Sequence, residues 1–218
     1  MKKIKIAIQG ELGAYSHIAA QNLFNDAEIK TCATFEETFK KAYQDESYKI
    51  IIPIENSLAG RVADIHYLLP KYKLQIHGEY FLNVEHNLLC KPEATINDIK
   101  YVRSHAQAIG QCQNIINKKK FQSIISADTA GSAKDLAEGN DKSIAAIASE
   151  LSAKIYKLKI LEKNIEDEKG NVTRFLIMGK NVEQPDFNKE KKFVTSCIFR
   201  LKSEPSALYK CLGGFATN

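Results

Sequence analysis

The segment Asn171-Val172-Thr173-Arg174-Phe175-Leu176-Ile177-Met178-Gly179 decides the fold of this 218-residue chain. Its apolar run, ended by glycine, predicts a strand over residues 174–179. Two α/β lobes are already complete before this strand begins, so we expect it to return to the first of them. The chain would then cross twice between the lobes. Two lobes joined by two crossings form a hinge that closes on a ligand.

The first lobe is predicted from the N-terminal third of the chain. Residues 4–9 and 48–54 are expected to be strands, and residues 16–24, 35–43 and 62–69 are expected to be helices. Thr34 and Glu37 form a capping box, in which each side chain satisfies an otherwise unpaired amide at the helix start. This box fixes where the second helix begins.

The second lobe repeats this alternation after a long extended segment, residues 74–90, which is expected to cross between the lobes. Strands are expected over residues 101–104, 121–126 and 143–148, and helices over residues 107–117, 129–138 and from 149 to 156. Such alternation predicts βαβ units and mainly parallel sheets. Lobe one should comprise about residues 1–75 and 160–181, and lobe two about residues 80–158.

The C-terminal part is expected to be a separate, incomplete α+β segment. Residues 182–191 are charged and aperiodic and predict a linker. A strand over residues 193–201 and a helix over 206–212, ended by Gly213-Gly214, are expected to follow. One strand and one helix cannot bury a core alone. The segment should therefore be disordered or associate, as a homodimer or homotetramer, to cover its strand edge and helix face.

Composition favours a reducing compartment and an anionic metabolite. The five cysteines are scattered and include no C-x-x-C pair, which argues against a disulfide framework and a thiolate zinc site. The net charge is +5, and the basic runs 118–120 and 189–192 lie at an expected helix end and in the linker. They lack the interleaved aromatics of a nucleic-acid groove. No run suits a signal peptide or membrane span, so a cytoplasmic location and no membrane partner are expected.

Four polar clusters each follow an expected strand, at the sheet edge where open α/β folds bind ligands. They are Gly13-Ala14-Tyr15-Ser16, Glu55-Asn56-Ser57, Ser104-His105-Ala106-Gln107 and Asp128-Thr129-Ala130. Each also has a plain interpretation as a glycine turn, an Asx turn or a helix cap. The free amides of the first cluster would hold a carboxylate. Their convergence favours a ligand site.

A fifth cluster, Asn171, Thr173 and Arg174, lies at the beginning of the strand that decides the fold. It is either a hairpin entry with an exposed arginine or part of the site. The sequence contains no H-E-x-x-H, Walker, G-x-G-x-x-G or G-x-S-x-G motif, and its five histidines lack metal-ligand spacing. We therefore expect no metal and no nucleotide cofactor.

Five runs taken in this order resemble the prephenate dehydratase family over almost all of residues 4–180. They are GELGAYSHIAA (10–20), IIPIENSLAG (51–60), VRSHAQAIGQC (102–112), ADTAGSA (127–133) and NVTRFLIMG (171–179). The resemblance implies two α/β lobes with a double-crossing hinge, like a type II periplasmic binding protein. The run SEPSALYKCLGGFATN (203–218) resembles the opening of the ACT domain that binds phenylalanine in this family.

The resemblance implies a reaction without a cofactor, in which prephenate loses carbon dioxide and water and becomes phenylpyruvate in L-phenylalanine biosynthesis. It assigns the catalytic role to Thr173. A threonine hydroxyl is a weak acid, so we interpret Thr173 as a positioned hydrogen-bond donor to the leaving hydroxyl.

The resemblance also implies two sets of site residues. Those expected around the carboxylates and keto group of the substrate are Asn56, Ser57, Ser104, Gln107, Thr129, Ala130, Arg174 and Phe175. Those expected to orient or support them are Glu55, Gly13, Ala14, Tyr15, His105 and Asn171. Arg174 either meets a carboxylate bidentately or holds the lobes in register.

Two other functions fit the same residues. An arogenate dehydratase performs the same elimination on the transaminated substrate, and a non-catalytic protein that binds a small acid shares the two-lobe architecture. Only the first strand and helix of an ACT domain lie within the sequence. We therefore expect added phenylalanine to leave activity and melting temperature unchanged; a saturable shift would contradict this.

Overall fold

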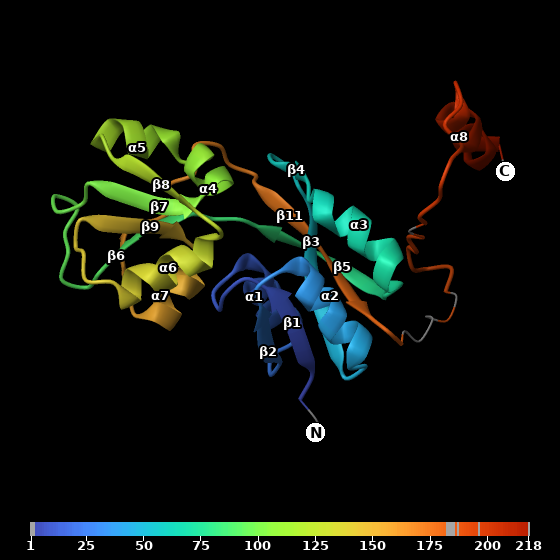
Figure 1. Cartoon of the computed structure of the whole chain (residues 1–218), viewed down its shortest axis with the longest axis horizontal. Helices are drawn as coiled ribbons and strands as arrows, with labels where there is room; N and C mark the ends of the chain where they lie inside the picture. The colour runs from blue at the N-terminus through green and yellow to red at the C-terminus, as the bar shows by residue number, and fades with distance from the viewer. Residues whose placement is uncertain (1–2, 182–185, 187, 196, 218) are drawn as a thin grey trace. The chain divides into compact units, whose positions relative to one another are not determined.

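The computed structural model describes residues 3–181, 186, 188–195 and 197–217 (Figure 1). The chain divides into two units, Met1–Val182 and Glu183–Asn218, which are described separately below. The first unit contains two α/β lobes, each built on its own sheet. None of the helices in the described part of the chain is long and apolar enough to cross a membrane.

The sheet of the first lobe has the strand order β2-β1-β3-β11-β5, with β4 paired to β3. The strands are β1 (Lys5–Gln9), β2 (Glu28–Cys32), β3 (Tyr48–Asn56), β4 (Gly60–Arg61), β5 (Gln75–Asn83) and β11 (Val172–Gly179). β1 pairs in parallel with β2 and β3, whereas β11 pairs antiparallel with β3 and β5. The expectation of a mainly parallel sheet is wrong here, because β5 leaves the lobe and β11 returns to it in the opposite direction.

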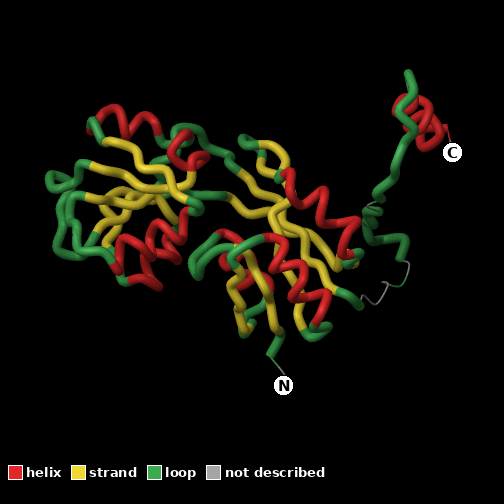
Figure 2. Tube along the Cα trace, in the orientation of Figure 1, coloured by secondary structure: helices red, strands yellow, loops and turns green. Residues whose placement is uncertain are grey.

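Helices cover both faces of this sheet (Figures 1 and 2). They are α1 (Tyr15–Leu23) on one face and α2 (Phe35–Gln44) with α3 (Ala63–Tyr72) on the other. Side chains alternate along β11, so that Phe175 and Ile177 pack toward α1, while Leu176 and Met178 pack toward α2 and α3. The expected return of this strand to the first lobe is confirmed. The capping box is present in a variant form: Glu37 N–H donates to Thr34 Oγ1, and Glu37 Oε2 accepts the N–H of Ala33, one residue before the cap, in place of that of Thr34.

The second lobe has the strand order β10-β6-β9-β7-β8. Its strands are β6 (Asn87–Cys90), β7 (Tyr101–His105), β8 (Gln122–Ser126), β9 (Ile144–Ala148) and β10 (Lys159–Glu162). Its helices are α4 (Ala106–Gly110), α5 (Gln113–Lys119), α6 (Thr129–Glu138) and α7 (Glu150–Tyr156). β7 pairs in parallel with β8 and β9, whereas β6 pairs antiparallel with β9 and β10. This sheet is mixed too, because β6, the strand on which the chain enters the lobe, runs antiparallel to both of its neighbours.

The differences from the expected elements that bear on the site are a divided helix and shifted crossings. The helix expected over residues 107–117 is two helices, α4 and α5, separated at Gln111 and Cys112. β5 belongs to the first sheet and β10 to the second, so the crossings are residues 84–86 and 163–171 rather than segments near 75 and 160. The separation at Gln111 matters for the site, because the side chain of this residue reaches the second crossing.

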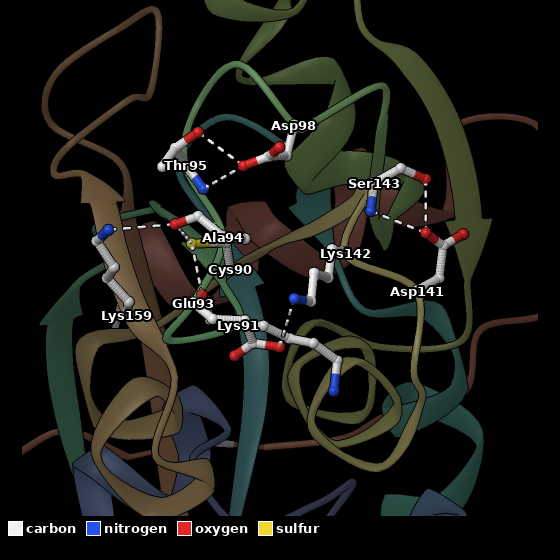
Figure 3. Close-up of polar contacts among 10 residues, drawn as sticks. All are labelled: Cys90, Lys91, Glu93, Ala94, Thr95, Asp98, Asp141, Lys142, Ser143 and Lys159. Carbon is white, nitrogen blue, oxygen red and sulfur yellow. Dashed lines mark hydrogen bonds and ion pairs between the residues drawn. The ribbon is translucent and has the colours of Figure 1, made fainter.

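Local hydrogen bonds close two polar turns of the second lobe (Figure 3). The amide and hydroxyl of Thr95 both donate to Asp98 Oδ2, at 2.8 and 2.7 Å. The amide and hydroxyl of Ser143 likewise donate to Asp141 Oδ1, at 2.8 and 2.7 Å. These bonds hold the pKa of both carboxyl groups below the usual value. Each carboxylate is therefore used in turn formation.

Among the described residues of the second unit, 186, 188–195 and 197–217, the helix is α8 (Ala207–Thr217). The strand expected over 193–201 is absent from its described residues, 193–195 and 197–201, where no neighbouring strand is available for pairing. The helix does not end at Gly213-Gly214 but continues through both glycines. Of the expected linker, residues 182–185 and 187 lie outside the described residues. The ACT-like assignment stays a prediction.

Candidate active site

Thr173 lies in β11 between Asn56 of β3 and Leu82 of β5, and 8% of its surface is exposed. Asn56 Nδ2 donates to Thr173 Oγ1 at 2.9 Å and to Asn171 Oδ1 at 2.6 Å. The other amide atom, Asn56 Oδ1, accepts the backbone N–H groups of Leu58 and Ala59 at 3.0 and 2.8 Å. Asn56 thus forms an Asx turn and contacts Thr173 at once. Because Thr173 Oγ1 accepts from Asn56, its hydroxyl proton is directed elsewhere and can be donated.

A chain of hydrogen bonds continues from Asn171 across the hinge. Asn171 Nδ2 donates to Gln111 Oε1 at 2.9 Å, and the same oxygen lies 2.8 Å from His86 Nε2. The hydroxyl of Tyr15 lies 2.8 Å from both His86 Nδ1 and Glu85 O, which share its single proton. Tyr15 and Asn56 belong to the first lobe and Gln111 to the second. The residues between them lie on the two crossings, so the site spans the hinge.

The two titratable residues of this hydrogen-bond chain, Tyr15 and His86, are neutral near pH 7. Burial raises the pKa of Tyr15 well above its usual value, and the nearby Cys112 and Glu166 raise it further. Burial lowers the pKa of His86, although the bond to Gln111 and the charge of Glu166 oppose this effect. His86 is 3% exposed, and its backbone N–H donates to Glu166 Oε2 at 2.9 Å. This hydrogen-bond chain therefore positions its groups without adding a charge to the site.

The loop before α1 joins the lobes rather than leaving its amides free. The carbonyl of Gly13 accepts the hydroxyls of Ser149 and Ser152, at 2.6 and 3.1 Å. Its amide donates to His17 Nδ1 at 3.0 Å, and the amide of Ala14 donates to Glu11 O. The amides of Gly13 and Ala14 are therefore already engaged within the first lobe. The carbonyl of Gly13 seats the first lobe against the second.

The expected site residues of the second lobe are not joined to Thr173 by any hydrogen bond described for this part of the chain. Ser104 is fully buried and donates to Ile147 O at 2.7 Å, and Ala130 is also fully buried. His105 Nδ1 accepts the backbone N–H of Gln107 at 3.3 Å. Gln107 is exposed, and Thr129 is partly exposed as the first residue of α6. Of this set, Ser104 and Ala130 are buried, whereas His105, Gln107 and Thr129 are at least partly exposed.

Arg174 lies on the face of β11 opposite to Thr173. Its guanidinium contacts Glu55 at 3.1 Å and Glu79 at 2.7 Å, and both carboxylates raise its pKa. Those partners belong to β3 and β5, so Arg174 ties three strands of one sheet and does not hold the lobes in register. It also lines a pocket of about 340 Å³. The other lining residues are Glu55, Asn56, Ser57, Gly60, Arg61, Phe81 and Val172.

Ser57 and Phe175 have structural contacts. The hydroxyl of Ser57 donates to Gly170 O at 3.1 Å and accepts the N–H of Val172 at 2.9 Å. It thereby fastens the end of β3 to the second crossing. The ring of Phe175 is 1% exposed and packs in the core of the first lobe. Phe175 is thus closed to a ligand, whereas the exposed Ser57 both makes these contacts and lines the pocket.

Sequence reasoning missed two members of the site, His86 and Gln111. Gln111 lies in the run VRSHAQAIGQC, but the helix expected over residues 107–117 passed through it, and only the structure shows α4 ending there. His86 lies in the extended crossing segment and carries no local signal. Among the described residues, no group of three or more His, Cys, Asp or Glu side chains is placed to hold a metal ion.

The chemistry available at Thr173 is hydrogen-bond donation, not nucleophilic attack. An activated threonine nucleophile needs a base that accepts its proton. The described neighbour of Thr173 Oγ1 is an amide N–H, which is a donor. A buried hydroxyl held in this way can stabilise an oxygen that gains negative charge as a bond breaks.

Comparison with known proteins identifies the family of this chain. Residues 6–183 match the prephenate dehydratase family. A bifunctional N-acyl-homoserine lactone acylase/prephenate dehydratase of Komagataeibacter europaeus is 39% identical over 215 residues, 97% of this chain and 75% of that protein. The chloroplastic arogenate dehydratase/prephenate dehydratase 2 of Arabidopsis thaliana is 39% identical over 214 residues, which cover 98% of this chain. This chain spans 56% of the plant relative.

A solved structure agrees as well. The prephenate dehydratase of Staphylococcus aureus superposes with a TM-score of 0.74 at 26% identity. The aligned region covers 97% of this chain and 78% of that one. The two-lobe α/β fold is therefore shared along the described first unit.

Proposed function

The chain belongs to the prephenate dehydratase family, a family of carbon–oxygen lyases, and on that premise we propose that it converts prephenate to phenylpyruvate. In this elimination the bond between the ring and its carboxylate breaks, and its electron pair enters the ring. The ring C–O bond then breaks, and the hydroxyl leaves as water after taking up a proton. Aromatisation drives the reaction.

The observation that carries this proposal is the hydrogen bond from Asn56 Nδ2 to Thr173 Oγ1. Because Asn56 occupies the oxygen of Thr173, the hydroxyl proton remains for the departing oxygen of the substrate. Hydroxide is a poor leaving group, and a strong hydrogen bond or proton transfer in the transition state lowers the barrier. We assign Thr173 as the catalytic donor and Asn56 and Asn171 as the residues that orient it.

Substrate contacts are proposed for the accessible members of the expected set. Gln107 and Thr129 can offer polar groups to the carboxylates or keto group of prephenate. For Arg174 we favour the strand-tying role, since two carboxylates engage its guanidinium. The cytoplasmic location stays a prediction.

A direct assay separates the candidate activities. We expect the purified chain to form phenylpyruvate from prephenate, measured by the absorbance of the aromatic product, and to turn over arogenate at least about tenfold less efficiently. Equal efficiencies would contradict the assignment to prephenate and give the chain both activities. Tight binding of prephenate without product would overturn the enzyme and favour the small-acid-binding protein.

Acylase activity is a second candidate, because the Komagataeibacter relative, which aligns with 97% of this chain, bears that name. Its test is the release of homoserine lactone from an N-acyl-homoserine lactone. The donor geometry at Thr173 does not suit a nucleophile, so an acylase activity should survive Thr173→Ala. Loss of both activities in that variant would place them at one site.

A further inference from the structure

The hydrogen-bond chain at the hinge has a direction that is set at one end by the backbone. The N–H groups of Leu58 and Ala59 can only donate, so the side-chain atom of Asn56 that faces them is Oδ1. Asn56 therefore presents Nδ2 to Asn171, and Asn171 presents Oδ1 in return, at 2.6 Å. Neither amide can be rotated without placing two donors or two acceptors face to face.

The same argument reaches His86 through Gln111. With its oxygen toward Asn56, Asn171 directs Nδ2 to Gln111, and Gln111 must present Oε1, at 2.9 Å. This oxygen also lies 2.8 Å from His86 Nε2. Since a carbonyl oxygen only accepts, His86 must carry its proton on Nε2. His86 Nδ1 then accepts from the hydroxyl of Tyr15, 2.8 Å away, and shares the single proton of that hydroxyl with Glu85 O.

We propose that His86 and Tyr15 are positioning residues, which hold Gln111 and Asn171 in the one orientation that leaves Thr173 a hydrogen-bond donor. Each carries out a different part of this role. His86 fills the second acceptor direction of Gln111 Oε1 with an N–H group. Tyr15 holds the imidazole from the first lobe, and Glu85 O is the second acceptor beside its hydroxyl.

Burial and connectivity make the arrangement specific to the hinge. His86 and Asn171 are each 3% exposed, so bulk water does not replace a lost partner without cost. The crossings that carry them are also joined directly. Val84 N–H donates to Asn171 O at 2.7 Å, and Ile165 N–H donates to His86 O at 2.8 Å. Movement of one crossing therefore also moves the hydrogen-bonding residue on the other crossing. As a result, the direction of the Thr173 hydroxyl depends on how the two lobes are seated.

The first test reads the His86 tautomer and does not depend on any activity. Two-bond ¹H–¹⁵N correlation spectra of histidine-labelled protein distinguish the two neutral tautomers, and His86→Gln identifies the His86 signal by its loss. We expect the Nε2–H form in the unaltered chain. A Nδ1–H form there would overturn the proposal.

The variant Asn56→Asp should change that tautomer from a distance. A carboxylate keeps the bonds from Leu58 and Ala59 but has no N–H for Asn171, so Asn171 and then Gln111 must turn over. Gln111 would present Nε2 to His86, and the imidazole would move its proton to Nδ1. An unchanged Nε2–H signal in folded Asn56→Asp would contradict the directional chain.

The second test is kinetic and rests on the proposed dehydratase function. His86→Asn cannot reach Gln111, and we expect kcat to fall about tenfold or more while KM changes by less than about threefold. His86→Gln places an amide N–H near the position of Nε2 and should recover most of the loss. Tyr15→Phe, which removes only the hydroxyl, should lower kcat about tenfold.

Matched controls separate positioning from general destabilisation. His66→Asn changes an exposed histidine of α3, and Tyr80→Phe removes a hydroxyl that accepts from Asn22 in the first lobe. Both should leave kcat within about twofold. Equal loss in His86→Asn and His86→Gln, or a rise in KM with kcat intact, would refute the positioning role. If neither the parent protein nor any variant turns over prephenate, the dehydratase proposal fails. The tautomer measurement still tests the direction of the hydrogen-bond chain in that case.

Discussion

Thr173→Ala is expected to lower kcat for prephenate by about two to four orders of magnitude, the range typical of removing a positioned acid or hydrogen-bond donor. In the alanine variant the departing hydroxyl of the substrate has lost its hydrogen-bond donor. Asn56 Nδ2 does not replace this donor, because the Asx turn holds it toward Asn171 and position 173. Substrate binding should change little, since the donor acts mainly when the C–O bond breaks. Turnover and calorimetric binding of prephenate measure the two effects separately.

Two replacements at the same position make this result specific. Thr173→Ser retains the hydroxyl and should keep activity within about tenfold of the parent. Thr173→Val retains the shape of the β-branched side chain but has no hydroxyl, and it should be as inactive as the alanine variant. An active valine variant would show that the hydroxyl is not the catalytic group. The melting temperature of each variant checks that the fold is intact.

Gly13→Ala is expected to destabilise the first unit by about 2–5 kcal/mol, because backbone strain and steric overlap add. Gly13 has φ +93°, and a Cβ built there would lie 2.4 Å from Ser152 Oγ and 2.8 Å from Ser152 Cα. The methyl group must push the loop away from α7, which breaks the bonds that Ser149 and Ser152 donate to Gly13 O. Since the loop leads to Tyr15, kcat should fall as well.

Gly170→Ala is the matched control for backbone strain. Gly170 has φ +84°, but nothing lies within 4 Å of a Cβ at that position, so only the conformational cost of about 1–2 kcal/mol applies. The difference between the two variants in denaturant unfolding reports the contact with Ser152. Adding Ser152→Gly to Gly13→Ala removes the side-chain overlap and should restore part of the stability. Equal destabilisation by both alanines would show that the lobes are not seated on Gly13.

Local features of the sequence were sufficient for much of the fold. The capping box of Thr34 and Glu37, the helix over residues 129–138 and the strand that ends at Gly179 all appear where expected. Periodicity and caps act within a few residues, so they can be recognised without knowledge of the fold. Strand direction is different. The sheets are mixed because two strands cross the hinge in opposite directions, and no local pattern encodes that.

The candidate site, like the fold, has features that were predicted from the sequence and features that only the tertiary structure decided. The sequence by itself predicted, from strand ends and the family resemblance, that Asn56, Asn171 and Thr173 share one polar site, and the structure joins them by hydrogen bonds. Only the tertiary structure decided which polar groups remain available. The Gly13 amide is used by His17, the Ser57 hydroxyl by the second crossing and the Arg174 guanidinium by two glutamates.

Tertiary structure also added His86 and Gln111, which lie 25 positions apart and meet only when the hinge forms. The physical reason is that a polar group has few hydrogen-bonding directions, and partners from distant segments decide how these are filled. Sequence determines which groups exist and in which element they lie. The folded hinge determines their orientation, and for Thr173 that orientation makes the hydroxyl a donor.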